Sequence, residues 1–402
     1  MKEILLIFVS LFLSSSLISQ TFSALNSGTG NELHGIKLLS DTKGIAVGDG
    51  GKILMTTSGV NWAQKISGIT AGLKDVEYIN TTTIIAVGDG GTIVKSTNGG
   101  MGWTSIYSGT TEMLLSVCVN GTDIYTCGQN GVILKSTDEG NSWSSVSPGQ
   151  GAHIFDVFFT SPTVGYAVGN DAHIHKTTNG GLSWTTLYDF DSGISANFQL
   201  RSIYFKDANN GFIVGKNLIE NQAIIIRTTN GGATWIPQIV YGDSYVDIKF
   251  VNNNVGFIVG QNLNSYVGVI SKTTDGGTNW TFLTSLPKVQ NAIAFSNSGV
   301  GYTCGFNGSI FKSTNINLGI DDLENNQTLS VYPNPSSEKI TITLDSSIAS
   351  KNLAIHVYSI SGEEIIFQSN TTTIDVSDFP TGTYFLKVQN ETSSWTKTII
   401  KE

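Results

Sequence analysis

One phrase of sequence recurs seven times along the chain, and this repetition constrains the fold more than any other feature. In its fullest form it has an apolar pair and a glycine, a polar turn, an apolar run, and then a Gly-Gly turn before tryptophan, as in AVGDGGTIVKSTNGGMGW. A period of 40 to 46 residues separates the glycines that follow the apolar pair, which are Gly48, Gly88, Gly128, Gly169, Gly215, Gly260 and Gly305. A unit of this length with four short strands is typical of one β-propeller blade.

The second copy shows how four strands fit into one unit. Apolar or alternating runs cover residues 73–79, 84–87, 92–95 and 103–107, each bounded by turn-forming residues. Six copies place a tryptophan at the start of the outermost strand, where burial of an indole, about 150–250 Å² each, contributes strongly to packing. We therefore expect four antiparallel strands in each unit, numbered from the centre of the propeller outwards.

The seventh copy ends near residue 315 and has no outer strand of its own. Residues 22–28 (FSALNSG) parallel residues 103–109 (WTSIYSG), with an aromatic residue and a glycine at the same offset. We predict that residues 21–28 supply the missing strand, which would remove an open sheet edge. The expected fold class is all-β, a seven-bladed β-propeller over residues 20–316 followed by a small C-terminal β-sandwich.

The two ends of the chain have different character from the repeats. Residues 1–19 combine an early lysine, a short apolar run and a serine-rich end, which predicts a signal peptide, because the run is too short to span a bilayer. No later segment reaches membrane-spanning length. Residues 317–328 are acidic and aperiodic and are expected to be a linker. Residues 329–402 contain five strand-like runs, at 329–332, 339–344, 354–359, 383–388 and 395–400.

Composition excludes some partners. The chain has 402 residues, a net charge of −9 and only 13% charged residues, so nothing favours binding to nucleic acid or to an anionic membrane. The three cysteines are Cys118, Cys127 and Cys304, too few for a disulfide framework. Cys127 and Cys304 align with valines of other repeats, which predicts buried thiols, while a Cys118–Cys127 bridge remains open.

The turn before each tryptophan carries a family resemblance. Residues 136–143 (STDEGNSW) resemble the Asp-box of bacterial neuraminidase repeats, and the whole pattern of residues 33–315 is similar to the propeller of photosystem II assembly factors. The resemblance implies that the boxes are structural and lie on blade turns. The aspartate is kept at two positions and replaced by asparagine at others; the box residues are Asn98, Trp103, Asp138, Trp143, Asn179, Trp184, Asn230, Trp235, Asp275 and Trp280.

The C-terminal segment carries a second resemblance. The residues VYPNP at 331–335, VYSISG at 357–362, PTGTYFLKV at 380–388 and KTIIK at 397–401 resemble the type A sorting domain of the type IX secretion system of Bacteroidetes. This resemblance implies that the tail is the partner of that secretion machinery and is removed after export. We therefore expect a protein that is secreted or held at the cell surface.

The expected function is binding of an extracellular glycan or protein by a monomeric propeller with no cofactor, no metal and no catalytic residue. The connections at residues 188–199, 216–222 and 261–267 are longer than their counterparts in other repeats, and all should lie on one face of the ring. Tolerated insertions without a function remain an alternative. The candidate ligand-binding residues on this face are Tyr188, Phe190, Asp191, Phe198, Arg201, Glu220, Tyr241, Tyr245 and Tyr266.

Other functions compete with binding. A glycoside hydrolase needs two well-spaced carboxylates, and Asp75, Asp156 and Asp247 lie in the innermost strands. A sialidase is excluded, because the chain has only two arginines, Arg201 and Arg227, and sialidases use three. The same scarcity argues against a photosystem-assembly role that depends on an arginine-rich patch. A purely structural surface protein is the remaining alternative.

One histidine pair invites a metal interpretation. His173 and His175 are two residues apart on one strand, and His153 belongs to the same repeat. Zinc needs three or four ligands. His175, however, aligns with apolar residues of other copies, which favours a packed position over a metal site.

Overall fold

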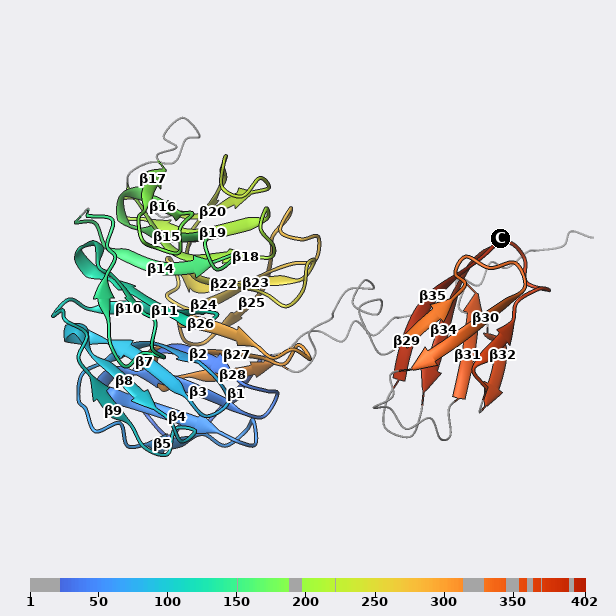
Figure 1. The fold of residues 1–402 in the computed structure, drawn as a ribbon, viewed down its shortest axis with the longest axis horizontal. Coiled ribbons are helices and arrows are strands. Elements are labelled where there is room, and N and C mark those ends of the chain that lie inside the picture. The colour runs from blue at the N-terminus through green and yellow to red at the C-terminus, as the bar shows by residue number, and fades with distance from the viewer. Residues whose placement is uncertain are drawn as a thin grey trace, which may run out of the picture. The chain divides into compact units, whose positions relative to one another are not determined.

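The computed structural model describes residues 22–149, 151–187, 197–220, 222–313, 329–344, 354–359, 364–369, 371–389 and 394–402. The chain divides into two compact units, the larger formed mainly by residues up to 317 and the smaller mainly by residues from 318 onwards. Both units are built from strands, as the all-β expectation requires (Figure 1). The predicted signal peptide at 1–19 and the predicted linker at 317–328 lie outside the described residues.

The larger unit contains four-stranded antiparallel sheets whose strand order follows the chain. The first three are β2 (Leu33–Leu38), β3 (Gly44–Gly48), β4 (Lys52–Thr56) and β5 (Ala63–Lys65); β6 (Leu73–Tyr78), β7 (Ile84–Gly88), β8 (Ile93–Ser96) and β9 (Thr104–Ile106); and β10 (Leu114–Asn120), β11 (Asp123–Gly128), β12 (Ile133–Ser136) and β13 (Ser144–Ser145). The next three are β14 (Ile154–Phe159), β15 (Gly165–Gly169), β16 (Ile174–Thr177) and β17 (Thr185–Leu187); β18 (Phe198–Phe205), β19 (Gly211–Asn217), β20 (Gln222–Thr228) and β21 (Ile236–Tyr241); and β22 (Asp243–Phe250), β23 (Gly256–Asn262), β24 (Gly268–Thr273) and β25 (Thr281–Leu286).

A further sheet joins the two ends of this unit. It contains β26 (Gln290–Phe295), β27 (Gly301–Gly305), β28 (Ile310–Ser313) and, as its outer strand, β1 (Phe22–Leu25). β1 is antiparallel to β28, with Phe22 opposite Ser313 and Leu25 opposite Ile310. In Figure 1 the blue β1 lies beside the orange β28.

The first strands of the sheets form a closed ring. β2, β6, β10, β14, β18, β22 and β26 contact one another in that order, and β26 contacts β2. Sheets that radiate from a ring of inner strands define a β-propeller. The apolar core lies between neighbouring sheets; Val47 and Ile53 of one sheet, for example, share a cluster with Leu73 and Val76 of the next.

The recurrent glycines of the sequence have a steric explanation. A Cβ atom on Gly88 would lie 2.0 Å from the carbonyl oxygen of Gly72, and one on Gly128 would lie 1.9 Å from that of Met113. In each sheet this carbonyl belongs to the residue just before the one that pairs with the glycine, as Gly72 precedes Leu73, next to a β-bulge such as that between Leu73 and Asp75. Close backbone approach, and not an unusual φ, therefore fixes these glycines.

The inserted residues of two hairpins lengthen strands. Residues 216–222 and 261–267 were expected to be long loops, but β19 extends to Asn217 and β23 to Asn262. The turns that remain are short, and Tyr266 in the second has a φ of +57°. The two hairpins are therefore held by ladder hydrogen bonds along most of their length.

The smaller unit has two sheets. One contains β29 (Leu329–Tyr332), β30 (Lys339–Leu344) and β33 (Thr373–Asp375), and the other has the order β32 (Glu364–Ser369), β31 (Ala354–Ser359), β34 (Gly382–Gln389) and β35 (Ser394–Lys401). Side chains of both sheets share one apolar core, which includes Ile340, Ile374, Val357 and Leu386. The sequence analysis missed β32 and β33, because β32 is almost wholly exposed and β33 has three residues.

Candidate functional site

A polar cavity of about 390 Å³ lies inside the ring of first strands. After each bulge one residue of the first strand pairs with the valine or cysteine of the second strand; going round the ring, these residues are Gly35, Asp75, Ser116, Asp156, Ser202, Asp247 and Ala292. All of them except Gly35 line the cavity. The three aspartates considered above for glycoside hydrolysis therefore occupy alternate sheets of one layer.

Each of these aspartates bridges its own sheet to the next one. Asp156 accepts hydrogen bonds from the backbone N–H of Val157 in its own strand (2.9 Å) and of Ile203 in the following sheet (2.9 Å). Asp75 and Asp247 repeat this arrangement, with Val117 N at 3.0 Å and Ile293 N at 2.9 Å as the partners in the next sheet. The carboxylates thus satisfy backbone donors that the bulges leave unpaired.

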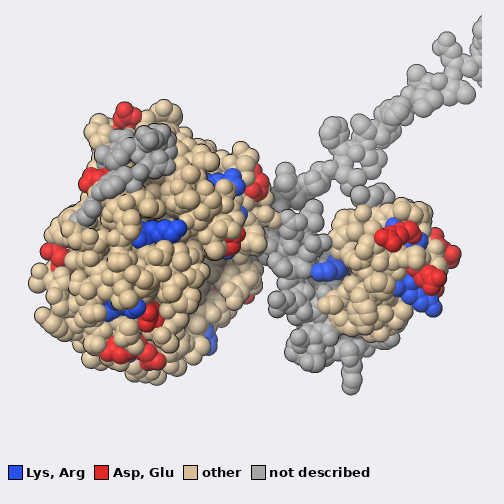
Figure 2. Space-filling view, turned by 45° about the horizontal axis from the view of Figure 1, so that its top comes forward, with Lys and Arg blue, Asp and Glu red and all other residues tan. Residues whose placement is uncertain are grey.

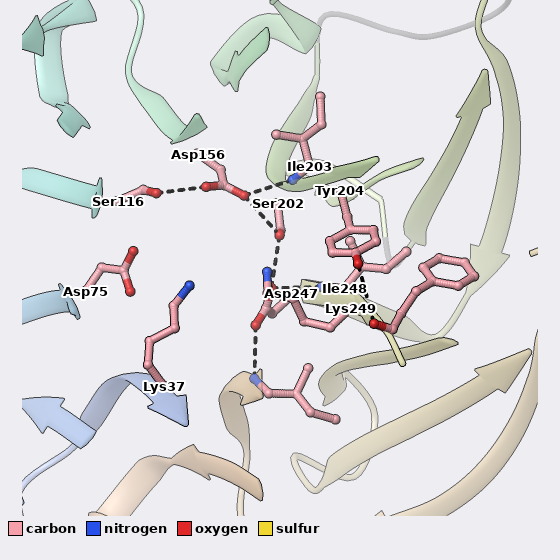
Figure 3. A network of polar contacts seen from close by, with 12 residues as sticks. Lys37, Asp75, Ser116, Asp156, Ser202, Ile203, Tyr204, Asp247, Ile248 and Lys249 are labelled. Atoms are coloured by element: carbon pink, nitrogen blue, oxygen red, sulfur yellow. Dashed lines mark hydrogen bonds and ion pairs between the residues drawn. The ribbon is translucent and has the colours of Figure 1, made fainter. Parts of the chain in front are cut away.

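Two serines form a network with Asp156 and Asp247 (Figure 3). The Ser116 hydroxyl donates to Asp156 (2.8 Å), and Ser202 lies between Asp156 and Asp247, at 3.1 and 3.0 Å from their oxygens. Because the carboxylate oxygens are engaged by backbone and hydroxyl donors, their structural role is accounted for without catalysis. Nothing in the described residues indicates a catalytic function.

Lysines balance part of the buried negative charge. Lys37 pairs with Glu77 at 2.7 Å, and Lys249 pairs with Asp247 at 2.9 Å. Burial raises the pKa of Asp75 to about 6 despite the opposing charge of Lys37. Burial opposes the charged form of Lys37, but the charges of Glu77, Asp75 and Asp247, with the hydrogen bond to Glu77, together outweigh it and raise the pKa of that lysine. In Figure 3 the Lys37 side chain points into the space between Asp75 and the serine–aspartate network.

Tyrosines of the second strands connect neighbouring sheets. The hydroxyl of Tyr125 donates to the carbonyl of Gly180 (2.8 Å), and that of Tyr166 donates to Gly231 (2.7 Å). Tyr302 makes the same bond to Gly59 (2.7 Å), which ties the last sheet to the first. These glycines belong to the turns before the tryptophans, so the boxes receive contacts from the preceding sheet.

The boxes themselves are held by their own side chains. In five of them the leading hydroxyl accepts a hydrogen bond from a glycine N–H, as Ser136 does from Gly140 at 2.8 Å. Burial favours the neutral form of Asp275, but hydrogen bonds from Asn279 and its neighbours outweigh this effect and lower the pKa of Asp275 to about 2. Asn98, Asn179 and Asn230 accept the equivalent backbone hydrogen bonds in other boxes. Of the box tryptophans, Trp235 is among the most deeply buried.

One end of the cavity opens as a mouth of about 330 Å³, whose polar and aromatic lining includes Glu32, His34, Lys74, Phe155, Arg201 and Asn291. Lys74 approaches Asp49 (3.1 Å) and Asp89 (3.5 Å), and His34 approaches Asp49 (2.8 Å). The guanidinium carbon of Arg201 lies 4.3 Å from the centre of the Phe155 ring. Aligning the residues that precede the bulges would have found His34, Lys74, Phe155 and Asn291, which the sequence analysis did not single out.

The predicted ligand-binding residues fall into four groups. Tyr188, Phe190 and Asp191 lie outside the described residues. Glu220, Tyr241 and Tyr266 are exposed, and Arg201 lines the mouth. Phe198 and Tyr245 are 3% and 2% exposed and pack in apolar clusters, which leaves neither ring available to a ligand.

His175 occupies a packed position, as its alignment with apolar residues of other repeats predicts. His175 is buried and its Nδ1 lies 2.9 Å from the Thr186 hydroxyl; burial, with a smaller contribution from His173, lowers the pKa of His175 to about 4. Among the described residues no group of three or more His, Cys, Asp or Glu could hold a metal ion. All three cysteines are free thiols, and burial raises the pKa of Cys118 to about 12.

The charged surface is sparse. Figure 2 shows isolated acidic and basic side chains separated by wide areas of other residues on one face of the molecule. In the part of the chain that the structure describes, no helix has the length and apolar character needed to cross a membrane.

Comparison with known proteins agrees with this architecture: a β-propeller joined to a sorting domain. Residues 330–402 match the secretion system C-terminal sorting domain, and residues 54–150 and 146–240 match the photosynthesis system II assembly factor YCF48 family. These matches confirm the two resemblances seen in the sequence. The sorting-domain match also supports export by the type IX secretion system.

Individual relatives are distant. The photosystem II assembly lipoprotein Ycf48 of Synechococcus sp. (strain CC9902) is 33% identical over 84 residues, which is 21% of this chain and only 23% of that relative. A structure of YCF48 bound to D1 peptide has a TM-score of 0.60 at 14% identity, covering 74% of this chain and 96% of the other. A GH74 xyloglucanase from Xanthomonas campestris gives 0.59 at 13% identity, covering 74% of this chain and 54% of its own. At such identities these structures show the fold alone.

Proposed function

We propose that this chain is an exported binding protein, in which a seven-bladed propeller holds an extracellular glycan or protein and a C-terminal β-sandwich directs secretion. In this proposal residues 1–19 are the signal peptide, residues 20–316 the propeller, residues 317–328 the linker and residues 329–402 the sorting domain. The mature protein acts in the medium or at the cell surface.

The observation that carries the proposal is a set of exposed side chains on the two lengthened hairpins. Leu218 and Ile219, at the tip of β19–β20, are 57% and 74% exposed, and Tyr266, at the tip of β23–β24, is 73% exposed. Tyr241, 77% exposed, is paired with Gln222 beside the first tip. Large apolar side chains presented by ordered hairpins cost solubility and are typical of interaction surfaces.

The fold comparisons support binding without identifying the ligand. One propeller of this shape holds a peptide and another belongs to a xyloglucanase, so the scaffold accommodates both ligand classes. The hydrolase alternative is disfavoured here, because Asp75, Asp156 and Asp247 accept backbone hydrogen bonds between sheets.

A glycan array and a pull-down from extracellular material test the proposal. Binding should be lost in a Tyr241→Ala/Tyr266→Ala double variant and kept in Tyr107→Ala, which removes a tyrosine that is 88% exposed on another sheet. Equal binding by the double variant and the wild type would contradict the assignment of this surface.

A further inference from the structure

Arg201 lines the mouth of the propeller and has no acidic partner among the described residues. No hydrogen bond or ion pair joins its guanidinium to another described residue, although the side chain is largely buried against Phe155. Its neighbour Lys74, by contrast, is paired with Asp49 and Asp89. The guanidinium nitrogens reach the solvent of the cavity, so an arginine without an acidic partner among the described residues is available there to an anionic ligand.

Lys216 adds a second positive charge at the same place. It pairs with Gln199 across the β18–β19 ladder, and Gln199 and Arg201 are two residues apart on β18. Arg201 lies in the β-bulge between Leu200 and Ser202, next to this pair, and its charge acts on Lys216, so the two cations lie near each other. Burial, and then the charge of Arg201, lower the pKa of Lys216. Neither cation has an acidic partner among the described residues.

The stacking on Phe155 prepares Arg201 for a planar ligand group. A guanidinium whose carbon lies over an aromatic ring keeps N–H groups that can donate to the two oxygens of a carboxylate. Asn291 and His34 line the same mouth. Nδ2 of Asn291 is bonded to Glu32 and Nε2 of His34 contacts Asp49, so the other polar atom of each side chain is the one that a hydroxyl group can use.

The net charge of the chain restricts the ligand further. At −9, the protein as a whole repels a densely charged polyanion. A ligand with one carboxylate among neutral hydroxyl groups can pair with Arg201 and Lys216 and experiences little of this repulsion.

We propose that the mouth of the propeller binds a carboxylate-bearing saccharide, with the uronic acid carboxylate on Arg201 and Lys216. This inference rests on the proposed binding function and names the ligand class for the channel mouth. Tyr241 and Tyr266 then belong to a wider contact surface on the same face.

The two arginines of the chain make a direct test practical. Full-length protein labelled with ¹⁵N-arginine gives two Nε–Hε signals, which Arg201→Gln and Arg227→Gln assign. Titration with D-glucuronate should shift the Arg201 signal in a saturable way and leave the Arg227 signal in place, while D-glucose at equal concentration shifts neither. Binding of glucuronate should weaken about tenfold or more in Arg201→Gln and less in Lys216→Gln, with Arg227→Gln as the matched control.

Three results overturn the proposal. They are an Arg201 signal that glucuronate does not move, an equal response to glucose, and a stronger response to N-acetylglutamate amide, which would assign the mouth to an acidic peptide. Any of these results is compatible with ligand binding that depends on Tyr241 and Tyr266. The proposed binding function is tested separately, by the glycan array and pull-down with the tyrosine double variant.

Discussion

The structure predicts that Asp156 stabilises the propeller through backbone hydrogen bonds and has no catalytic role. Its two oxygens accept from Val157 N and Ile203 N, and the Ile203 side chain beside it is 1% exposed. A buried N–H without a partner costs about 1–3 kcal/mol, and Asp156→Ala leaves two of them. The substitution also removes the cost of burying the carboxylate, which raises the pKa of Asp156, so the free energy of unfolding should fall by roughly 2–4 kcal/mol. Asp156→Asn keeps one acceptor and presents a donor to the other N–H, and should lose about 1–3 kcal/mol.

Urea unfolding followed by tryptophan fluorescence measures these losses, because six of the seven tryptophans belong to the propeller repeats. The matched control is Asp171→Asn, an exposed turn position with φ of +56°, where the equivalent turns carry Asn130 and Asn307. The control should remain within about 0.5 kcal/mol of wild type. If both Asp156 variants have the same free energy of unfolding as the control, the bridging role is refuted. Loss of polysaccharide turnover in a fully stable Asp156→Asn protein would instead assign the aspartates to catalysis.

Further predictions concern closure, pH and export. Deletion of residues 20–30 removes β1 and exposes the edge of β28, and should lower the melting temperature of the propeller sharply; an unchanged melt would contradict the closing role of this strand. The pKa of Asp75 is raised from 3.8 to about 6, so its contribution to stability is fully present below pH 3.8 and is lost as the pH rises through 6. At 1.36 kcal/mol per pKa unit this contribution is about 3 kcal/mol at most. Between pH 4 and 6.5 the free energy of unfolding should therefore fall more steeply with rising pH in the wild type than in Asp75→Asn. Removal of residues 394–402 deletes β35, which pairs with β34 along its whole length, and should leave the protein in the periplasm when cell fractions are probed; secretion at the wild-type level would contradict the role of the tail.

Most of the fold can be predicted from the sequence, because the same pattern of strand and turn residues occurs in every repeat. The period, the turn residues and the tryptophans specify four strands per unit, and the likeness of residues 22–28 to residues 103–109 points to the place where β1 lies. The recurrent glycines are readable as backbone constraints even before the carbonyl that they avoid is known. β32 escapes this kind of reasoning, since it has an exposed pattern and belongs to no repeat.

The site is less predictable, because the bulge in each first strand breaks the alternation of faces on which sequence reasoning depends. Tyr245 precedes such a bulge and is buried, in the position that Leu33, Leu73 and Leu114 hold in other sheets. That alignment was present in the sequence and would have removed Tyr245 from the candidates.

The sequence by itself determined the strand repeat, the boxes and the export signal, since these depend on residues close together along the chain. Only the tertiary structure decided what the inner aspartates do, because each meets its backbone partner in the neighbouring sheet, more than forty residues away, as Asp156 meets Ile203. It also decided that Arg201 lies over Phe155 in a cavity with no carboxylate partner among the described residues. Which charged groups are buried or paired depends on which strands are neighbours, and the closure of the ring determines those neighbours.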